Sequence, residues 1–465
     1  MTSPLPSRNS LAEIDVATLI HPYTNLDAHL TSGPTIMVEG KGCRVRDDAG
    51  RWYLDAMAGL WCCSLGFDNA RVAAAVHRQM LEMPSYHVFV GASNRPAIEL
   101  AERMVALAPA GLDKVLFAGS GSEANDAAIK LVWYYNDARG KPEKKKIIGR
   151  DRGYHGVTIA AASATGQPAN HGGFSLPLPG FLHLGSASWY HDAQPGESAE
   201  AFADRRAAEL EALILHEGAD TIGAMIAEPI NGAGGIIVPP PGYFQKIQAV
   251  LRRHDILLIA DEVICGFGRT GRMFGSEHFG ITPDIMTVAK ALSAAYLPIS
   301  ATLCSDAIFQ AMAQQSRARG GFGHGVTYSA HPACAAAALE VLKIYEEMDI
   351  VSVVQRAGQH FQSRIAQLSG HPLVGQVRGM GLLGAVEPAA DPKARRSFAP
   401  SEKVGPMIQA RMLEQGIIVR AMRNDAIGMS PPLIIDTQDI DLIVDTLGTV
   451  LDDILPSLRT RGLVA

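Results

Sequence analysis

The chain has 465 residues, of which 47% are hydrophobic and 19% charged, with a formal net charge of −6. This length suits two or three compact units, and the composition supplies a large buried core, which excludes an intrinsically disordered protein. The mild negative charge gives no reason to expect nucleic acid or an anionic membrane as a partner.

The elements expected along the chain indicate an α/β fold. An N-terminal arm, to about position 20, is followed by a β-hairpin at 45–55, whose turn comes from Asp48-Ala49-Gly50. From about residue 95 to 330, helical and strand patterns alternate, as is typical of a parallel α/β sheet. The predicted strands are 114–118, 145–149, 222–227, 256–260, 284–288 and 299–304, and the predicted helices are 125–137, 200–216 and 243–253. Beyond about 335, a long helical segment leads into a mixed tail with strands near 382–386 and 417–420.

The cysteines and the N-terminus bear on the cell compartment. The six cysteines form no CxxC pair, and the adjacent Cys62 and Cys63 match neither a usual structural bridge nor a zinc pattern. No secretory signal is evident, and no run approaches the ~20 apolar residues needed to cross a bilayer. We therefore expect a cytoplasmic protein with reduced thiols, no metal and no membrane contact.

Two apolar runs, each of strand length, end in side chains of opposite charge. The run 256–260 leads to Asp261, and the run 285–289 leads to Lys290, 29 positions later (290 − 261). Such runs suit strands covered on both faces of a parallel sheet, and ligands bind beyond the carboxyl ends of those strands. An amine there can form a Schiff base with an aldehyde cofactor, while a carboxylate keeps a pyridinium nitrogen protonated, which is the chemistry of pyridoxal phosphate (PLP). Taken singly, Lys290 would be a solvated strand end and Asp261 a helix N-cap.

A glycine-rich loop after the strand 114–118 is a candidate phosphate site. Ser120, Gly121 and Ser122 precede a helical pattern, so backbone N–H groups and two hydroxyls are available for a dianionic phosphate. The loop also fits the dinucleotide pattern G-x-G-x-x-A, which requires an acidic residue about 20 positions on. The nearest strand-end acid, Asp151, is 32 positions past the first glycine (151 − 119). A nicotinamide or flavin site and a plain tight turn stay open as alternatives.

An aromatic loop follows the strand 145–149. Tyr154 could stack on a heteroaromatic ring from this loop, with His155 beside it, or could pack against the loop itself. Val263, two residues past Asp261, would suit the opposite face of the ring or would fill the core.

Two further loops carry candidate polar side chains. Glu228 ends the strand 222–227 and could orient a cofactor group or a substrate-binding arginine; a structural ion pair is the alternative. Thr327 lies with His324 in the glycine-rich segment 320–332, where a hydroxyl could donate to phosphate; a plain turn is the alternative.

Together these residues strongly resemble the class III aminotransferases of PLP fold type I, over a stretch from about residue 20 to 460. The matching stretches are 120–125, 153–156, 227–229, 261–263, 290–292 and 327–332. The resemblance implies an α/β fold with a large domain around a mostly parallel seven-stranded sheet and a smaller α/β domain built from both terminal segments. The expected bounds are 1–65 for the arm and part of the small domain, 66–335 for the PLP-binding domain and 336–465 for the C-terminal small domain.

The resemblance also implies roles for individual residues. Lys290 would carry PLP, Asp261 would contact the pyridine nitrogen, and Tyr154 would stack on the ring. Gly121 and Ser122 would hold the phosphate. The family further implies a homodimer with shared sites, in which Thr327 reaches the phosphate of the PLP in the other copy; whether dimers pair into tetramers is left open.

Within the family, the chain looks most like the amine:pyruvate (omega-amino) transaminases. Trp61 and Phe89 would wall the substrate pocket, and Arg420 would grip the carboxylate of the keto acid, with Arg423 as the competing candidate. The expected reaction moves an amino group from a primary amine or omega-amino acid to pyruvate by a ping-pong mechanism, giving an aldehyde or ketone and alanine. The departures are Val90, where an aromatic residue can occur, and the lack of glycines directly after the lysine. The alternative is another class III enzyme, such as a diamine, GABA-type or ornithine-type transaminase or an aminomutase.

Overall fold

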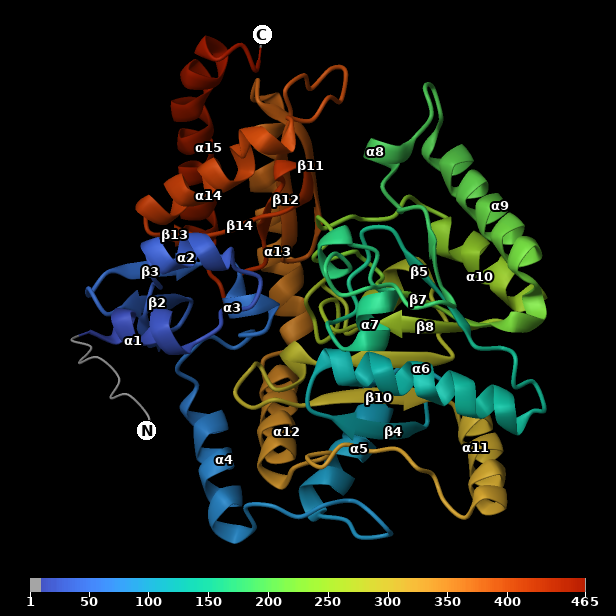
Figure 1. Ribbon diagram of the computed structural model, residues 1–465. Coiled ribbons are helices and arrows are strands. Elements are labelled where there is room, and N and C mark those ends of the chain that lie inside the picture. The colour runs from blue at the N-terminus through green and yellow to red at the C-terminus, as the bar shows by residue number, and fades with distance from the viewer. Residues whose placement is uncertain (1–9, 465) are drawn as a thin grey trace, which may run out of the picture.

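The computed structural model describes residues 10–464, so residues 1–9 of the expected arm and residue 465 lie outside the described range. A central sheet has seven strands in the order β4-β10-β9-β8-β7-β5-β6 (Figure 1). Strand β10 is antiparallel to both its neighbours, and the five strands from β9 to β6 run parallel, which confirms the predicted mostly parallel sheet. In sheet order the strands are Lys114–Ala118, Ser300–Cys304, Ile285–Val288, Leu257–Asp261, Ile222–Ala227, Lys146–Arg150 and Phe181–Leu184.

Successive residues of the central strands alternate between two hydrophobic clusters. In β8, Leu258 and Ala260 belong to the cluster that also contains Phe244 of α10 (Tyr243–Arg253). Leu257 and Ile259 belong to the cluster on the other face, which the helix α6 covers. The continuous apolar run therefore reflects a strand buried on both sides, as the pattern predicted.

Helix α6 spans Gly121–Ala138 and begins four residues before the predicted start at 125. Its early start has a local cause, because the Ser120 hydroxyl accepts a hydrogen bond from the backbone N–H of Glu123 at 3.2 Å and so caps the helix. The glycine-rich loop is consequently the first turn of a helix, and its free N–H groups lie at the carboxyl edge of the sheet.

Two smaller four-stranded sheets come from the ends of the chain. One consists of β1 (Met37–Lys41), β2 (Arg44–Asp47), β3 (Trp52–Asp55) and β13 (Ile417–Ile418), and the other of β11 (Val374–Met380), β12 (Leu383–Pro388), β15 (Ile427–Met429) and β14 (Arg420–Ala421). Because β13 pairs with β3, the blue N-terminal and orange C-terminal segments lie side by side (Figure 1). The predicted strand 417–420 is two strands, since β13 joins the first sheet and β14 pairs with β15 in the second. The domain bounds at 65 and 335 stay predictions.

The remaining helices connect and cover these sheets. They are α1 (Leu11–Thr18), α2 (Leu26–Ser32), α3 (Ala58–Trp61), α4 (Ala70–Glu82), α5 (Arg95–Leu107), α7 (Ile159–Ala164), α8 (Trp189–Asp192), α9 (Ala199–Glu217), α11 (Asp306–Arg319), α12 (Pro332–Glu347), α13 (Ile350–Ala366), α14 (Val404–Glu414) and α15 (Thr437–Thr460). Within residues 10–464, no helix has the length and apolar character needed to cross a membrane. All six cysteines fall in this range and are free thiols.

Candidate active site

The central sheet brings Asp261 and Lys290 to one edge. Asp261 is the last residue of β8 and pairs in register with Thr287 of the neighbouring parallel strand β9. Lys290 follows three residues later, and both side chains line a cavity of about 150 Å³. The same cavity collects these other predicted residues: Gly121, Ser122, Tyr154, His155, Glu228 and Val263.

The carboxylate of Asp261 is buried and held from several sides. Its Oδ2 atom accepts a hydrogen bond from Asn125 Nδ2 at 2.8 Å and lies 2.8 Å from His155 Nδ1. Its Oδ1 atom accepts from the backbone N–H of Val263 at 3.1 Å. A carboxylate with this many fixed donors keeps one orientation, so it can present its negative charge to a ligand at a defined point.

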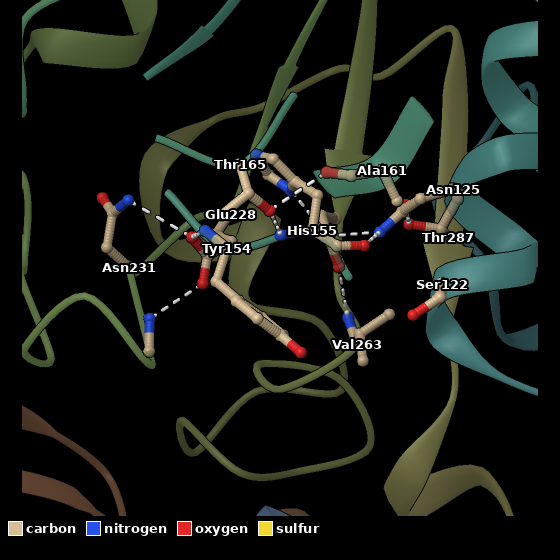
Figure 2. A network of polar contacts seen from close by, with 12 residues as sticks. Ser122, Asn125, Tyr154, His155, Ala161, Thr165, Glu228, Asn231, Val263 and Thr287 are labelled. Carbon is tan, nitrogen blue, oxygen red and sulfur yellow. Dashed lines mark hydrogen bonds and ion pairs between the residues drawn. The ribbon is translucent and has the colours of Figure 1, made fainter. Parts of the chain in front are cut away.

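Asn125 is a site residue that the sequence reasoning missed. Besides Asp261, its Nδ2 atom donates to the backbone oxygen of His155 at 2.6 Å, and its Oδ1 atom accepts from Thr287 Oγ1 at 2.7 Å. Figure 2 shows Asn125 and Thr287 together on one side of His155. The usable signals were an amide on the buried face of α6 and a threonine inside an apolar strand, because buried polar groups need partners.

Glu228 fixes the loop that carries Tyr154. Its carboxylate accepts from the backbone N–H groups of Tyr154 at 3.0 Å and Gly232 at 2.9 Å, and from Asn231 Nδ2 at 3.2 Å (Figure 2). Burial raises the pKa of Glu228. The partners of the Glu228 carboxylate are amide N–H groups. Arg150 does not pair with that carboxylate but donates to the main-chain oxygen of Glu228 at 2.5 Å. The carboxylate therefore fixes the loop of Tyr154, and its action on a cofactor group or a substrate-binding arginine stays a prediction.

Lys290 combines burial with an uncommon backbone conformation. Its φ angle of 49° lies in the left-handed region, which costs a non-glycine residue about 1–2 kcal/mol. Burial lowers the pKa of Lys290, while the negative charges of Asp261, Cys62 and Glu228 partly oppose that shift. A larger fraction of this amine is therefore neutral near pH 7 than of an exposed lysine, and only the neutral form is nucleophilic.

The start of α6 and the aromatic loop approach each other closely. The Ser122 hydroxyl accepts from the backbone N–H of Val157 at 3.1 Å, and a Cβ on Gly156 would lie only 2.4 Å from the Ser122 Oγ atom. Ser120 caps the helix and does not line the cavity, so its contact with a cofactor stays a prediction. A buried amine, a fixed carboxylate, an aromatic ring and a helix N-terminus together suit a phosphorylated pyridine aldehyde such as PLP.

Five predicted residues do not line this cavity: Ser120, Trp61, Phe89, Thr327 and Arg420. Trp61 is buried in a cluster with Ile264, which lines the cavity. Phe89 is 39% exposed and lines a separate cavity of about 450 Å³. Thr327 is exposed on the loop after α11.

The two candidate arginines have different neighbours. The positive charge of Arg420 opposes the burial that raises the pKa of Tyr154. Burial lowers the pKa of Arg152, and the charge of Arg423 lowers it further. Arg420 is thus near enough to Tyr154, which lines the cavity, for its charge to act on that hydroxyl.

The N-terminal arm also contacts the site, which the sequence reasoning did not foresee. The Tyr23 hydroxyl lies 3.4 Å from the Tyr154 hydroxyl and accepts a hydrogen bond from Asn170 Nδ2 at 2.6 Å. A residue from the turn between α1 and α2 thereby contacts Tyr154, which lines the cavity.

Comparisons with known proteins match almost the whole chain. The family model "Aminotransferase class-III" matches residues 27–451. A solved omega transaminase from Pseudomonas jessenii in complex with PMP superimposes with a TM-score of 0.94 at 50% identity, covering 96% of this chain and 98% of that one. The diaminobutyrate–2-oxoglutarate transaminase of Halomonas elongata is 42% identical over 99% of both chains. The chloroplastic gamma aminobutyrate transaminase 3 of Solanum lycopersicum is 46% identical over 90% of this chain and 81% of its own length.

The family match confirms the resemblance found in the sequence, including fold type I and the use of PLP. The buried lysine, the fixed carboxylate and the helix N-terminus are present where that chemistry needs them. The protein therefore belongs to the class III aminotransferases, which are PLP-dependent enzymes that act on small-molecule amines and keto acids.

Proposed function

We propose that this aminotransferase moves an amino group from a primary amine or omega-amino acid to pyruvate, with alanine as the second product. The observation that supports the proposal is that Arg420 lies outside the cavity lining but near enough to Tyr154 for its charge to act on that residue. A guanidinium on a long stem can bind the keto-acid carboxylate bidentately and turn away when an uncharged amine enters. The similarity to the omega transaminase from Pseudomonas jessenii supports the omega-transaminase part of the proposal, and its name states no acceptor.

Asp261 and Lys290 have different roles in the proposed reaction. When bound, PLP supplies an aldehyde that exchanges amines and a ring that accepts the electron pair left by the lost proton of the donor carbon. The Asp261 carboxylate, held by Asn125 and His155, keeps the proton on the pyridine nitrogen. The Lys290 Nζ atom takes the proton from the donor carbon and returns it to the carbon of the cofactor aldehyde, C4′. The two half-reactions alternate, so the kinetics are ping-pong.

Other residues bind and orient. The N–H groups at Gly121 and Ser122, at the start of α6, would hold the phosphate of PLP, and Tyr154 and Val263, which line the cavity, would contact its ring. Trp61, behind Ile264, limits the depth of the substrate pocket. Together these residues would hold the cofactor in a fixed orientation beside Lys290.

Two copies of the chain share their sites in this proposal. Phe89 and Thr327 lie at the surface, outside the cavity that contains Lys290, and so are available to complete the site of a second copy. The apolar character of the groove around Phe89 suits burial in a homodimer. The cytoplasmic location expected from the sequence stays a prediction.

The second candidate is a transaminase of diamine or GABA type that uses 2-oxoglutarate. The relative from Halomonas elongata, whose name states that acceptor, favours it. A panel of amine donors tested with pyruvate and with 2-oxoglutarate separates the two candidates. Alanine formed in stoichiometric amounts, faster than glutamate, supports the proposal. Faster glutamate formation with every donor would replace it by the second candidate.

A further inference from the structure

Three metal-binding side chains converge in the N-terminal arm, away from the PLP cavity. Asp15, His21 and His29 place one potential ligand atom each within 4.8 Å of one another, and no other such group of three occurs in residues 10–464. The Nε2 atoms of His21 and His29 lie 2.8 and 3.2 Å from the same carboxylate oxygen, Oδ1 of Asp15. The two imidazole rings are 4.2 Å apart between their centroids.

The surrounding segment has little else to hold it. Helix α1 has eight residues and helix α2 has seven, both too short to be stable in isolation. None of the residues of α1 is buried, and His29 is the only buried residue of α2. Figure 1 shows both helices at the blue end of the chain. The contacts between Asp15, His21 and His29 therefore join α1 to α2 in a segment that has no buried apolar residue in either helix.

The ligand set and its spacing suit a divalent transition metal. Zinc binds imidazole nitrogen and carboxylate oxygen at about 2.0–2.2 Å, which places the donors of a tetrahedral site about 3.3 Å apart. The separation of 3.2 Å between His29 and Asp15 is close to that value, and the 2.8 Å between His21 and Asp15 would have to widen by about 0.5 Å on metal binding. Without a metal, two imidazole groups must share one carboxylate oxygen as hydrogen-bond donors. With a metal, each nitrogen and the oxygen contribute a lone pair to a common centre.

We propose that Asp15, His21 and His29 form a Zn²⁺ site that closes the N-terminal arm on itself, with a fourth position left for water. This departs from the expectation, drawn from the cysteine pattern, that the chain binds no metal. The three ligands come from α1, the following linker and α2, so one ion fixes all three parts of the arm. Metal binding and local folding are then coupled.

The site is connected to the active site by two residues. Pro22 and Tyr23 follow His21 directly, and the Tyr23 hydroxyl reaches Tyr154 and Asn170. Proline restricts the backbone between the metal ligand and the tyrosine. A bound Zn²⁺ thus holds Tyr23 in contact with Tyr154, and its removal releases the arm without removing any residue that lines the PLP cavity.

The test uses untagged PLP-loaded enzyme, treated with a chelator and then titrated with Zn²⁺ or Co²⁺. We expect one zinc ion per chain by equilibrium dialysis and visible Co²⁺ absorption bands from the nitrogen and oxygen ligands. Asp15→Asn and His21→Gln should each weaken the affinity for Zn²⁺ by more than about tenfold. The loss of a residue that only supports a metal ligand already costs about 10- to 100-fold, and these residues are the ligands themselves. His77→Gln, at an exposed position in α4, is the matched control and should bind as the wild type does. Amide hydrogen exchange in residues 11–32 should slow when Zn²⁺ is added.

Substoichiometric zinc uptake by the wild type would overturn the site, as would equal affinities in the wild type and the two ligand variants. Far-ultraviolet circular dichroism establishes that the variants are folded. If either variant does not fold, the Co²⁺ titration of the wild type decides: a lack of ligand-field bands at one equivalent contradicts the proposal. If the three side chains only form hydrogen bonds with one another, adding metal should leave the amide hydrogen exchange of residues 11–32 unchanged.

Discussion

His155 and Asp261 are 106 residues apart in the chain, yet the Nδ1 atom of the first lies 2.8 Å from the Oδ2 atom of the second. Both side chains are buried, at 2% and 3% exposure. The Nε2 atom of His155 is also buried and makes no hydrogen bond to any residue between 10 and 464. The imidazole therefore serves Asp261 through one nitrogen, which makes His155 a positioning residue for the carboxylate.

Asp261→Asn tests the role of that carboxylate. The substitution keeps the size of the side chain but removes its charge, and the new amide must meet the donors of Asn125 and His155. A charge-assisted hydrogen bond contributes about 1.5–3 kcal/mol, so we expect kcat to fall by about 10- to 100-fold or more. Steady-state kinetics with saturating PLP measure the effect. Asp48→Asn, at an exposed turn, is the control, and equal activity of the two variants would contradict the assignment.

Lys290→Ala should abolish turnover, because it removes both the amine that captures the cofactor and the base that moves the proton. The near-visible absorption of the covalently attached cofactor should disappear, and reduction with borohydride should add no mass at this position. Lys343→Ala, on the exposed side of α12, is the control and should keep both properties. Full activity of Lys290→Ala would remove the catalytic assignment.

The pH dependence of PLP capture follows from the burial of Lys290. Its pKa is lowered from 10.5 by burial, so the neutral amine is present at lower pH than in an exposed lysine. The rate constant for PLP capture by the apoenzyme should rise with pH and reach its midpoint below 10.5. Stopped-flow absorption measures it, with Lys343 peptide as the exposed reference. A midpoint at or above the reference would show that the amine is solvated and that the cavity does not activate it.

The lowered pKa of Lys290 also predicts the direction in which the stability of the apoenzyme changes with pH. The folded state disfavours the charged form of Lys290. The contribution of the neutral amine to the free energy of unfolding is therefore fully present above the pKa that Lys290 has in the unfolded chain, and it is lost as the pH falls through the pKa that Lys290 has in the folded chain. In Lys290→Met, which cannot titrate, the apoenzyme should therefore lose less stability than the wild type as the pH falls. Urea unfolding of both apoenzymes between pH 10 and pH 7 measures this difference, and parallel curves would contradict it.

Most of the central sheet could be predicted because its strands are apolar on both faces and end at polar residues. The predicted bounds of β4 and β7 are those of the structure, and β8 is displaced by one residue. Strand β6 (Phe181–Leu184) was missed, since its four residues include His183 and form no continuous apolar run. Local pattern thus identifies long buried strands and fails for a short edge strand.

The site was predictable where position along a strand determines where a side chain points. Asp261 ends a strand, and Glu228 and Lys290 follow strands, so the carboxyl-end rule brought them together. Asn125 and Tyr23 were missed because their importance comes from partners far away in the sequence, 136 residues in one case and 131 in the other. Such contacts depend on how α6 and the arm pack, and no local pattern encodes that packing.

Arg420→Ala and Arg423→Ala compare the two candidate carboxylate-binding residues. If Arg420 binds the keto acid bidentately, its loss should raise the KM for pyruvate by about 10- to 100-fold, from a charge-assisted interaction of about 1.5–3 kcal/mol. The KM for an uncharged amine donor should change little, because the arginine turns away in that half-reaction. Arg423, whose charge acts on Arg152, should give a near-normal KM for pyruvate. Since the two half-reactions are kinetically separate, each KM can be read independently, and the reverse ranking of the two variants would assign the carboxylate to Arg423.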